Sequence, residues 1–414
     1  MAAPAFNHGD VAWLLTASSL VLFMSVPGLA LFYGGLVRAR SVISTMMYTF
    51  VGFALVLIAW VLLGFGIAFG KGLLVGNPLW YTAWLAHPSP AQLFAGVPLP
   101  IYIGFQGVFA AIATAIISSA VVERARIEAW SLFAILWLLA VYSVVAHWVW
   151  GGGWIASMRK LIGLPEALDF AGGLVVHVAS GFSALTLALL LGRRRGVREV
   201  EPVPHNIPLV LIGTGILWFG WLGFNAGSAL AANGQASMAW LVTAVAAAAG
   251  GIAWLLVTLF KTGRASSVAF ASGVVAGLVA ITPCAGYVGP LEAIVIGVVA
   301  SIISYYAMEW RISRGIDETL DAWAVHGMSG FWGNLAVGIF ANPAVSGKSG
   351  LIYGNVAQFA SQVIAGIAVA AYVMAVTAIL YFIVEKLVGW RVPAEAEYVG
   401  LDAAEYGEQA YVSV

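Results

Sequence analysis

Eleven apolar stretches, each long enough to cross the hydrocarbon core of a membrane, follow one another along this chain. A transmembrane helix needs about 20 predominantly apolar residues. Such a chain cannot fold as a water-soluble domain, and its composition, 62% hydrophobic and 9% charged, agrees. The sequence therefore predicts an all-α polytopic membrane protein with eleven transmembrane helices. The stretches cover residues 11–33, 42–69, 99–122, 129–151, 170–191, 207–229, 237–260, 267–283, 288–308, 322–341 and 357–388.

The distribution of lysine and arginine predicts how these helices are oriented. Cytoplasmic loops collect basic residues. If the N-terminus is outside, 14 of the 18 basic residues fall on the cytoplasmic side, including the run in 193–198. The outer side then holds only Lys71, Arg159, Lys160 and Lys348. We therefore predict an outer N-terminus and a cytoplasmic C-terminus.

A polar, proline-rich linker at 193–208 divides the first ten stretches into five and five. Two successive halves of five helices have opposite orientations, which is the inverted-repeat arrangement of many transporters. We expect a transmembrane domain over 1–392 and a cytoplasmic acidic tail over 393–414. Within the domain, the pseudo-repeats cover about 11–191 and 207–341, and an extra eleventh helix covers about 357–388. The start, MAAPAFNHGD, has no basic region, so no cleaved signal peptide is expected.

Two histidines lie inside apolar stretches, His177 in the fifth and His326 in the tenth. Ionisable residues at membrane depth are usually functional, although a neutral core histidine bonded to a carbonyl is the alternative. The fifth and tenth stretches are counterparts that enter from opposite faces, so both imidazoles approach the middle of the membrane. Each follows an aspartate, Asp169 or Asp321, at a helix N-cap position. For both aspartates we favour capping over proton transfer.

Six motifs in order make the chain resemble the ammonium transporter family (Amt/Mep/Rh) over essentially its whole length. Trp150, which the Rh branch generally lacks, indicates the Amt/Mep branch, of prokaryotic type. The motifs are VPGLALFYGGLVR (26–38), VWGGGW (149–154), DFAGGLVVH (169–177), WLGFNAGSAL (221–230), ITPCAGYV (281–288) and DAWAVHGMSGFWG (321–333).

The resemblance implies a role for each matching residue. An indole face attracts a poorly hydrated cation by about 0.5 to 2 kcal/mol, although Trp150 as an interfacial belt residue is the alternative. The implied roles are substrate recruitment by Trp150, Ser228 and Phe109, a gate formed by Phe109 and Phe224, a pore lined by His177 and His326, and support or deprotonation by Asp169.

Physical chemistry limits what such a pore carries. An isolated charge in an apolar interior costs many kcal/mol, so we expect ammonium to lose a proton near the gate and to cross as ammonia, with net charge movement. An electroneutral gas channel, or an ammonium sensor with little flux, remains the alternative. A membrane metalloprotein or oxidoreductase that uses His147, His177 and His326 as ligands is a third hypothesis.

Partners and cofactors are predicted mainly from the resemblance. It implies a homotrimer in the inner (plasma) membrane and a cytosolic PII-type signalling protein at the inner face. We expect a transporter and not an enzyme, with no cofactor and no metal. Cys284 is the lone cysteine, which excludes an intramolecular disulfide, and the zero net charge gives no sign of a nucleic-acid partner.

Overall fold

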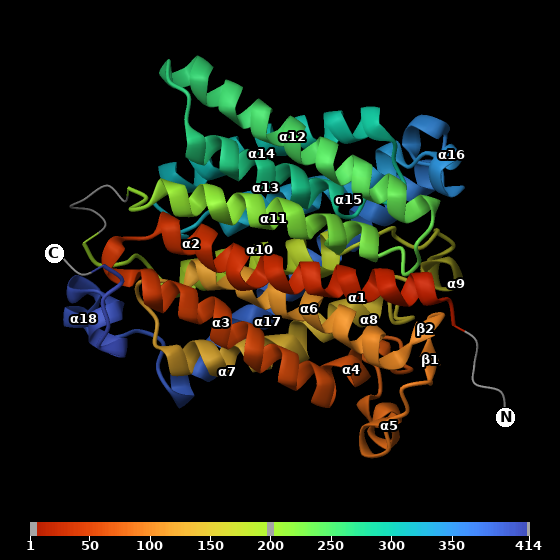
Figure 1. Ribbon diagram of the computed structural model, residues 1–414, viewed down its shortest axis with the longest axis horizontal. Coiled ribbons are helices and arrows are strands. Elements are labelled where there is room, and N and C mark those ends of the chain that lie inside the picture. The colour runs from red at the N-terminus through yellow and green to blue at the C-terminus, as the bar shows by residue number, and fades with distance from the viewer. Residues whose placement is uncertain (1–5, 197–202, 412–414) are drawn as a thin grey trace.

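The structure, a computed structural model, describes residues 6–196 and 203–411. Long helices dominate it and run roughly along its longest axis (Figure 1). Residues 1–5, 197–202 and 412–414 lie outside the described residues. Part of the predicted linker, with Arg198, and the last three residues of the predicted tail are therefore not placed.

The first predicted half folds into five helical segments, each of which contains a π-helical or 3-10 turn. In chain order their elements are α1 (His8–Phe23), η1 (Met24–Leu29) and α2 (Ala30–Leu36); η2 (Ala39–Ser41), α3 (Val42–Ala59), η3 (Trp60–Gly64) and α4 (Phe65–Phe69); α6 (Leu99–Ile117) and η5 (Ser118–Ala120); α7 (Ile127–Trp137), η6 (Leu138–Tyr142) and α8 (Ser143–Val149); η7 (Gly173–Val178) and α10 (Ala179–Leu191).

The second half and the C-terminal helix follow the same plan with fewer interruptions. Their elements are α11 (Ile207–Gly227), α12 (Gly234–Thr262), α13 (Ser267–Ile281), α14 (Pro290–Ser313), η8 (Trp323–Met328), α15 (Ser329–Phe340) and α17 (Val356–Leu387). Short elements occupy the connections: η4 (Pro78–Tyr81), α5 (Thr82–Ala86), the hairpin β1 (Leu93–Phe94) and β2 (Val97–Pro98), α9 (Met158–Ile162), α16 (Pro343–Ser346), η9 (Leu351–Tyr353), α18 (Ala394–Val399) and η10 (Asp402–Tyr406).

The helices coincide with the predicted stretches to within a few residues. Among the residues that the structure describes, nine helical segments are long and apolar enough to cross a membrane. The predicted stretch 267–283 contains the shorter apolar helix Ser267–Ile281, and 322–341 contains η8 and α15. The predicted helical membrane fold is thus confirmed, with the short hairpin of β1 and β2 as an addition to it. The count of eleven spans and the orientation stay predictions.

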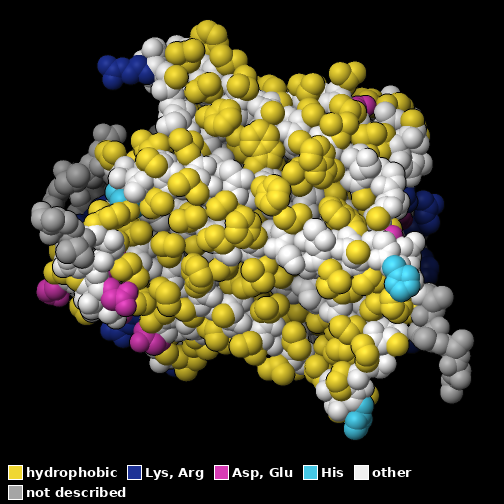
Figure 2. Space-filling view, viewed as in Figure 1, with side chains coloured by type: hydrophobic (Ala, Val, Ile, Leu, Met, Phe, Trp, Pro, Cys, Tyr) yellow, Lys and Arg dark blue, Asp and Glu magenta, His cyan; other side chains and the backbone are white. Residues whose placement is uncertain are grey.

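The surface of the bundle carries an apolar belt. Figure 2 shows hydrophobic side chains across the middle of the visible face and charged side chains at its two ends. Large apolar side chains on the helices stay exposed, such as Ile58 at 60%, Phe219 at 55% and Ile367 at 58%. Exposure of this extent on several helices suits contact with lipid and not with water.

Glycines let helices α12, α13 and α14 approach one another closely. A Cβ atom built on Gly277 would lie 2.2 Å from the carbonyl oxygen of Ala246, and one on Gly250 would lie 2.4 Å from that of Gly273. Larger residues do not fit at these backbone contacts. Close packing of small residues is a main source of association between helices in a membrane.

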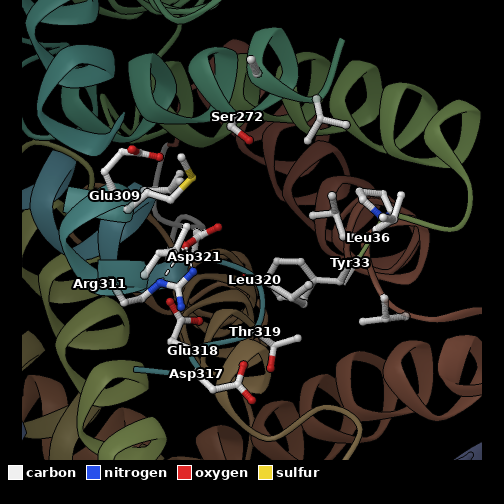
Figure 3. A pocket seen from close by; sticks show the side chains of 18 of the residues that line it. Tyr33, Leu36, Ser272, Glu309, Arg311, Asp317, Glu318, Thr319, Leu320 and Asp321 are labelled. Atoms are coloured by element: carbon white, nitrogen blue, oxygen red, sulfur yellow. Dashed lines mark hydrogen bonds and ion pairs between the residues drawn. The ribbon is translucent and has the colours of Figure 1, made fainter. Parts of the chain in front are cut away.

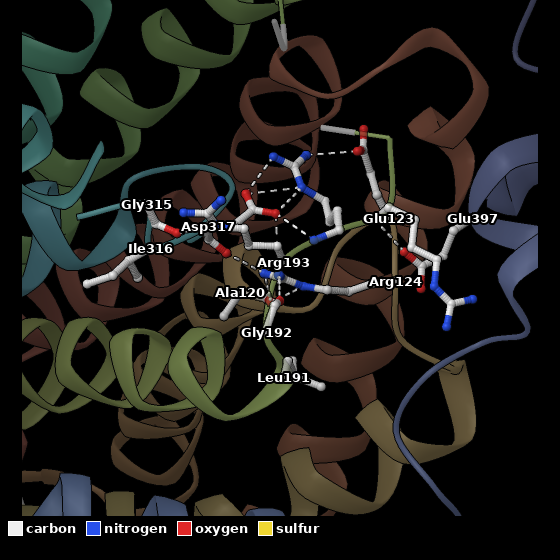
Figure 4. A network of polar contacts seen from close by, with 12 residues as sticks. Ala120, Glu123, Arg124, Leu191, Gly192, Arg193, Gly315, Ile316, Asp317 and Glu397 are labelled. Atoms are coloured by element: carbon white, nitrogen blue, oxygen red, sulfur yellow. Dashed lines mark hydrogen bonds and ion pairs between the residues drawn. The ribbon is translucent and has the colours of Figure 1, made fainter. Parts of the chain in front are cut away.

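A buried network of charges joins the two halves at one end of the bundle (Figure 4). Arg194 pairs with Glu123 of the first half at 2.8 Å and with Asp317 of the second half at 2.8 Å. Arg38 also pairs with Glu123 at 2.7 Å, and Arg124 lies 3.5 Å from Asp317. We call the end that carries these five residues the arginine end, and the other the opposite end.

The network makes the free energy of unfolding depend on pH. Burial opposes ionisation of Asp317, but the guanidinium groups of Arg194 and Arg124 hold the pKa of that carboxyl well below its usual range. Because the pKa of Asp317 is lower in the folded protein than in the unfolded chain, its carboxylate stabilises the fold fully above the unfolded pKa of about 3.9. This contribution to the free energy of unfolding is lost as the pH falls through the folded pKa.

We expect Asp317→Asn to lower the free energy of unfolding by about 3 to 5 kcal/mol at neutral pH, because it leaves buried Arg194 without one of its partners. Melting curves in detergent between pH 7 and pH 3 would measure this. The wild type should lose stability below about pH 4, and the variant should lose less over the same range. Parallel pH profiles would contradict the assignment.

Candidate functional site

The two membrane histidines meet inside the bundle. His177 lies in η7 and His326 in η8, and their side chains are almost fully buried. Their Nδ1 atoms are 3.3 Å apart, so the Nδ1–H of one imidazole donates to the Nδ1 of the other. Nε2 of His177 is buried without a hydrogen-bond partner among the described residues.

Two glycines bring the histidine helices together. A Cβ on Gly181 would lie 2.2 Å from the backbone nitrogen of Gly327, and a Cβ on Gly330 would lie 2.8 Å from Cβ of His177. Later residues of one helix thus contact earlier residues of the other. The helices cross antiparallel, which is the relation that an inverted repeat requires of its counterpart helices.

A hexapeptide repeat marks both helices. His177 begins HVASGF and His326 begins HGMSGF, 149 residues apart, so each histidine is followed four residues later by a crossing glycine. The charges and the order of the two stretches do not reveal this repeat. It is the signal that would have identified Gly181 and Gly330.

Asp169 caps the first of these helices. Its carboxylate accepts four backbone N–H bonds, from Gly172 at 2.8 Å, Gly173 at 2.6 Å, Leu174 at 2.8 Å and Val175 at 3.2 Å. These donors are the otherwise unpaired N–H groups of a helix start. Asp169 therefore performs the capping role that we favoured for it.

Asp321 does not cap the second helix, and that prediction is wrong. Its carboxylate instead accepts from Arg311 at 2.6 and 2.9 Å. The N–H of Trp323 donates at 3.0 Å to the carboxylate of Glu318, which the sequence analysis had not singled out. Glu318 precedes His326 by eight residues, as Asp169 precedes His177. The spacing to the histidine would have identified Glu318.

A column of aromatic rings leads to the histidines. The rings of Phe109 and Phe224 stack with centroids 3.9 Å apart and an interplanar angle of 12°, and Phe105 lies 4.7 Å from Phe109. Trp221, which the sequence analysis did not select, stacks on His177 at 5.2 Å. Phe109 and Phe224 are 1% and 0% exposed, so the passage between them is closed in this structure.

Trp150 and Ser228 are the residues that directly follow the ends of α8 and α11. The indole N–H of Trp150 donates to the carbonyl oxygen of Asp169 at 2.9 Å, and the Ser228 hydroxyl donates to that of Phe224 at 2.9 Å. Both side chains are partly exposed. The bond to Asp169 ties Trp150 to the start of η7, a closer connection to the site than an interfacial belt residue requires.

Two cavities adjoin the histidines, and the smaller one also touches Phe224 of the phenylalanine stack. A cavity of about 10 Å³ touches both imidazoles and is otherwise lined by apolar residues such as Leu29, Ile112 and Leu217. A larger one of about 700 Å³ extends from His326 to the arginine end (Figure 3). The described residues thus form a narrow apolar cavity at the histidines and a wider chamber beyond it, whose wall includes charged side chains at the arginine end.

His147 lies apart from this arrangement. It is buried, and its ring nitrogens lie 3.1 and 3.0 Å from the carbonyl oxygens of Ala68 and Gly72. Within residues 6–196 and 203–411, no group of three or more histidine, cysteine, aspartate or glutamate side chains is arranged to hold a metal ion. The geometry therefore offers no support for the metalloprotein hypothesis.

Comparison with known proteins identifies the family. The profile of the Ammonium Transporter Family matches residues 12–411. The chain belongs to the ammonium transporter family. The ammonium transporter Amt1 of Archaeoglobus fulgidus is 45% identical over 407 residues, which cover 98% of this chain and 100% of the relative. An ammonium transporter of Aquifex aeolicus is 44% identical over 408 residues, which cover 98% of this chain and 94% of the relative.

Solved structures of the family share the fold. Mep2 of Saccharomyces cerevisiae superposes with a TM-score of 0.85 at 32% identity, over 95% of this chain and 89% of that protein. A protein described as a sensor Amt protein superposes with a TM-score of 0.86 at 28% identity, over 96% and 98%. The curated relatives are named as ammonium transporters. The predictions of a multi-pass membrane protein of the Amt/Mep type, and of a transporter in place of an enzyme, are therefore confirmed.

We expect Gly181→Ala to separate the two histidine helices, because its Cβ would collide with the Gly327 backbone. Overpacking of this kind costs about 1 to 3 kcal/mol, although alanine normally stabilises a helix by about 1 kcal/mol relative to glycine. Thermal melting in detergent would measure the loss.

Gly215→Ala is the matched control, since a Cβ there meets nothing within 4 Å. It should leave melting unchanged or raise it slightly. Equal effects of the two substitutions would contradict a special role for the Gly181 crossing.

Proposed function

We propose that this protein transports ammonium across the plasma membrane by recruiting it at the opposite end, deprotonating it near Phe109 and Phe224, and conducting ammonia past His177 and His326. The observation that carries the proposal is the hydrogen-bonded histidine pair, 3.3 Å apart, between a closed aromatic stack and a cavity that leads to the arginine end. The positive-inside pattern makes the arginine end cytoplasmic in this proposal.

Recruitment uses Trp150 and Ser228, with Phe109 beneath them. The indole face attracts a cation, and the Ser228 oxygen retains a lone pair for an ammonium N–H because its own hydrogen donates to Phe224. Asp169 supports this site in two ways: its carbonyl holds the indole N–H and its carboxylate caps η7. Four N–H bonds to that carboxylate make support a better role for it than proton uptake.

Deprotonation follows from the closed stack. Rings that touch at 3.9 Å leave no path for a hydrated ion, and a bare ion in an apolar passage costs many kcal/mol. Neutral ammonia enters an apolar passage without the free-energy cost of burying a charge. Beyond the rings, the free Nε2 of His177 offers a polar contact to a small solute in an otherwise apolar cavity. The proton would follow through the histidine pair, which gives net charge movement.

Two other modes share this geometry. An electroneutral gas channel would use the same passage without moving the proton. The structural similarity to a protein described as a sensor Amt protein favours an ammonium sensor with little flux as a second candidate. Measurements of flux and of current distinguish the electrogenic transporter, the gas channel and the sensor.

Assembly as a homotrimer and docking of a PII-type signalling protein at the cytoplasmic face also belong to the proposal. The tail is anchored where such a partner would meet it: the carboxylate of Asp402 accepts from the backbone N–H groups of Ile43 and Ser44, at 3.0 and 2.7 Å, at the start of α3. Movement of the tail would therefore reach a membrane helix directly.

An ammonium pulse onto proteoliposomes, with current and internal pH recorded together, tests transport. We expect alkalinisation inside with a current of positive charge inward, and loss of the current in His177→Ala, because that change removes one partner of the proton path. His147→Gln, outside the passage, is the control. Alkalinisation without current would support the gas channel, and neither signal in folded protein would support the sensor.

Substrate recruitment is tested by Trp150→Leu and Ser228→Ala. Loss of the cation–π contact should raise the KM for ammonium about 2- to 30-fold, which corresponds to about 0.5 to 2 kcal/mol. Trp154→Leu removes a neighbouring tryptophan that packs on Trp148, and it should leave the KM unchanged. Equal effects of Trp150→Leu and Trp154→Leu would contradict a recruiting role for Trp150.

A further inference from the structure

One buried carboxylate oxygen beside the cavity at the arginine end has no hydrogen-bond partner among the described residues. The cavity, of about 700 Å³, is bounded by both halves of the chain, with Glu309, Glu318 and Asp321 among its acidic residues (Figure 3). Glu318 is 0% exposed. Its Oε2 accepts the N–H of Trp323, while Oε1 has no hydrogen-bond partner among the described residues.

The neighbouring guanidinium groups are already paired with other carboxylates. Arg311 bonds Asp321 at 2.6 Å, and Arg194 bonds Asp317 at 2.8 Å and Glu123 at 2.8 Å. Among the residues that the structure describes, no ion pair includes Glu318. The buried negative charge of Glu318 thus lacks a partner of its own next to a chamber large enough for solvent and small ions.

Asp169, the counterpart of Glu318 in the first half, shows that a capping carboxylate does not need an oxygen without a hydrogen-bond partner. Asp169 accepts four backbone N–H bonds at the start of η7. Glu318 occupies the same place, eight residues before a histidine, and accepts one. The two halves therefore use equivalent carboxylates differently: one oxygen of Glu318 caps the helix, and the other has no hydrogen-bond partner among the described residues.

A bound cation would compensate the buried negative charge of the Glu318 carboxylate. Burial, together with the nearby carboxylate of Asp321, raises the pKa of Glu318, although Arg311, the N–H of Trp323 and the side chain of Ser119 oppose the shift. An ion with N–H donors needs more than one oxygen around it. The Oγ1 atom of Thr319, the next residue, is likewise buried without a partner among the described residues and lines the same cavity.

We propose that Oε1 of Glu318 and Oγ1 of Thr319 form a second cation site, which binds ammonium at the arginine end of the passage. This inference rests on the proposed function, since it assigns the place where the transported species is held at the cytoplasmic side. The ligand class is a small monovalent cation that donates hydrogen bonds. Recruitment at Trp150 and binding at Glu318 then occupy opposite ends of one path.

Glu318→Gln tests the site because the amide oxygen keeps the bond to Trp323 while the charge is lost. We expect the KM for ammonium presented at the arginine end, in inside-out membrane vesicles, to rise about tenfold, the effect of losing one charge-assisted hydrogen bond. The KM in right-side-out vesicles should not change. Glu309→Gln is the matched control, because it removes an exposed carboxylate from the same cavity.

An unchanged KM at the arginine end, or equal changes at both faces, would overturn the site. Equal effects of Glu309→Gln and Glu318→Gln would also overturn it, since they would indicate a general field of the chamber. The vesicle measurement requires flux, so a wild type without flux would refute the proposed function and would leave the site to a measurement of binding.

Binding is measured without flux by melting the purified protein in ammonium chloride and in sodium chloride of equal concentration. In a Trp150→Leu, Ser228→Ala background, we expect ammonium to raise the melting temperature more than sodium does, and Glu318→Gln to abolish the difference. No difference between the two salts in that background would refute the site, whether or not the protein transports.

Discussion

The antiparallel crossing of the two histidine helices is the contact on which the rest of the site depends. At Gly181 the backbone of one helix approaches the backbone of the other so closely that even a methyl group would collide. This approach places Nδ1 of His177 and Nδ1 of His326 at hydrogen-bond distance. Because packing between small residues holds helices together in a membrane, the same contact supplies both the geometry of the pair and part of its stability.

Each histidine helix begins at a buried carboxylate. Asp169 and Glu318 satisfy the first N–H groups of their helices from within the protein, where water is scarce and an unpaired group is costly. The two carboxylates lie toward opposite ends of the passage, as the antiparallel crossing requires. Their bonding differs, and that difference gives the passage two unlike ends: one tied to a tryptophan, the other open to a charged chamber.

The fold was largely predictable, and the site was predictable in part. Apolar stretches separated by polar loops identify membrane helices reliably because the bilayer permits few other structures. His177 and His326 stood out because each is polar within an apolar stretch, and the family resemblance supplied Phe109, Phe224 and Trp150. Asp321 was assigned a cap from its position just before the helix, yet the neighbouring Arg311 captures its carboxylate. The position of Asp321 before the helix did not reveal that Arg311, ten residues earlier, binds the same carboxylate.

By itself, the sequence determined the membrane-spanning helical architecture, the family, and which polar side chains lie in apolar surroundings. Those properties follow from composition, periodicity and motifs, which act locally along the chain. Only the tertiary structure decided that Trp221 stacks on His177, that the rings of Phe109 and Phe224 close the passage, and that one oxygen of Glu318 is left without a partner. These contacts join side chains from distant segments of the chain. No local sequence pattern specifies which of several possible partners each side chain meets.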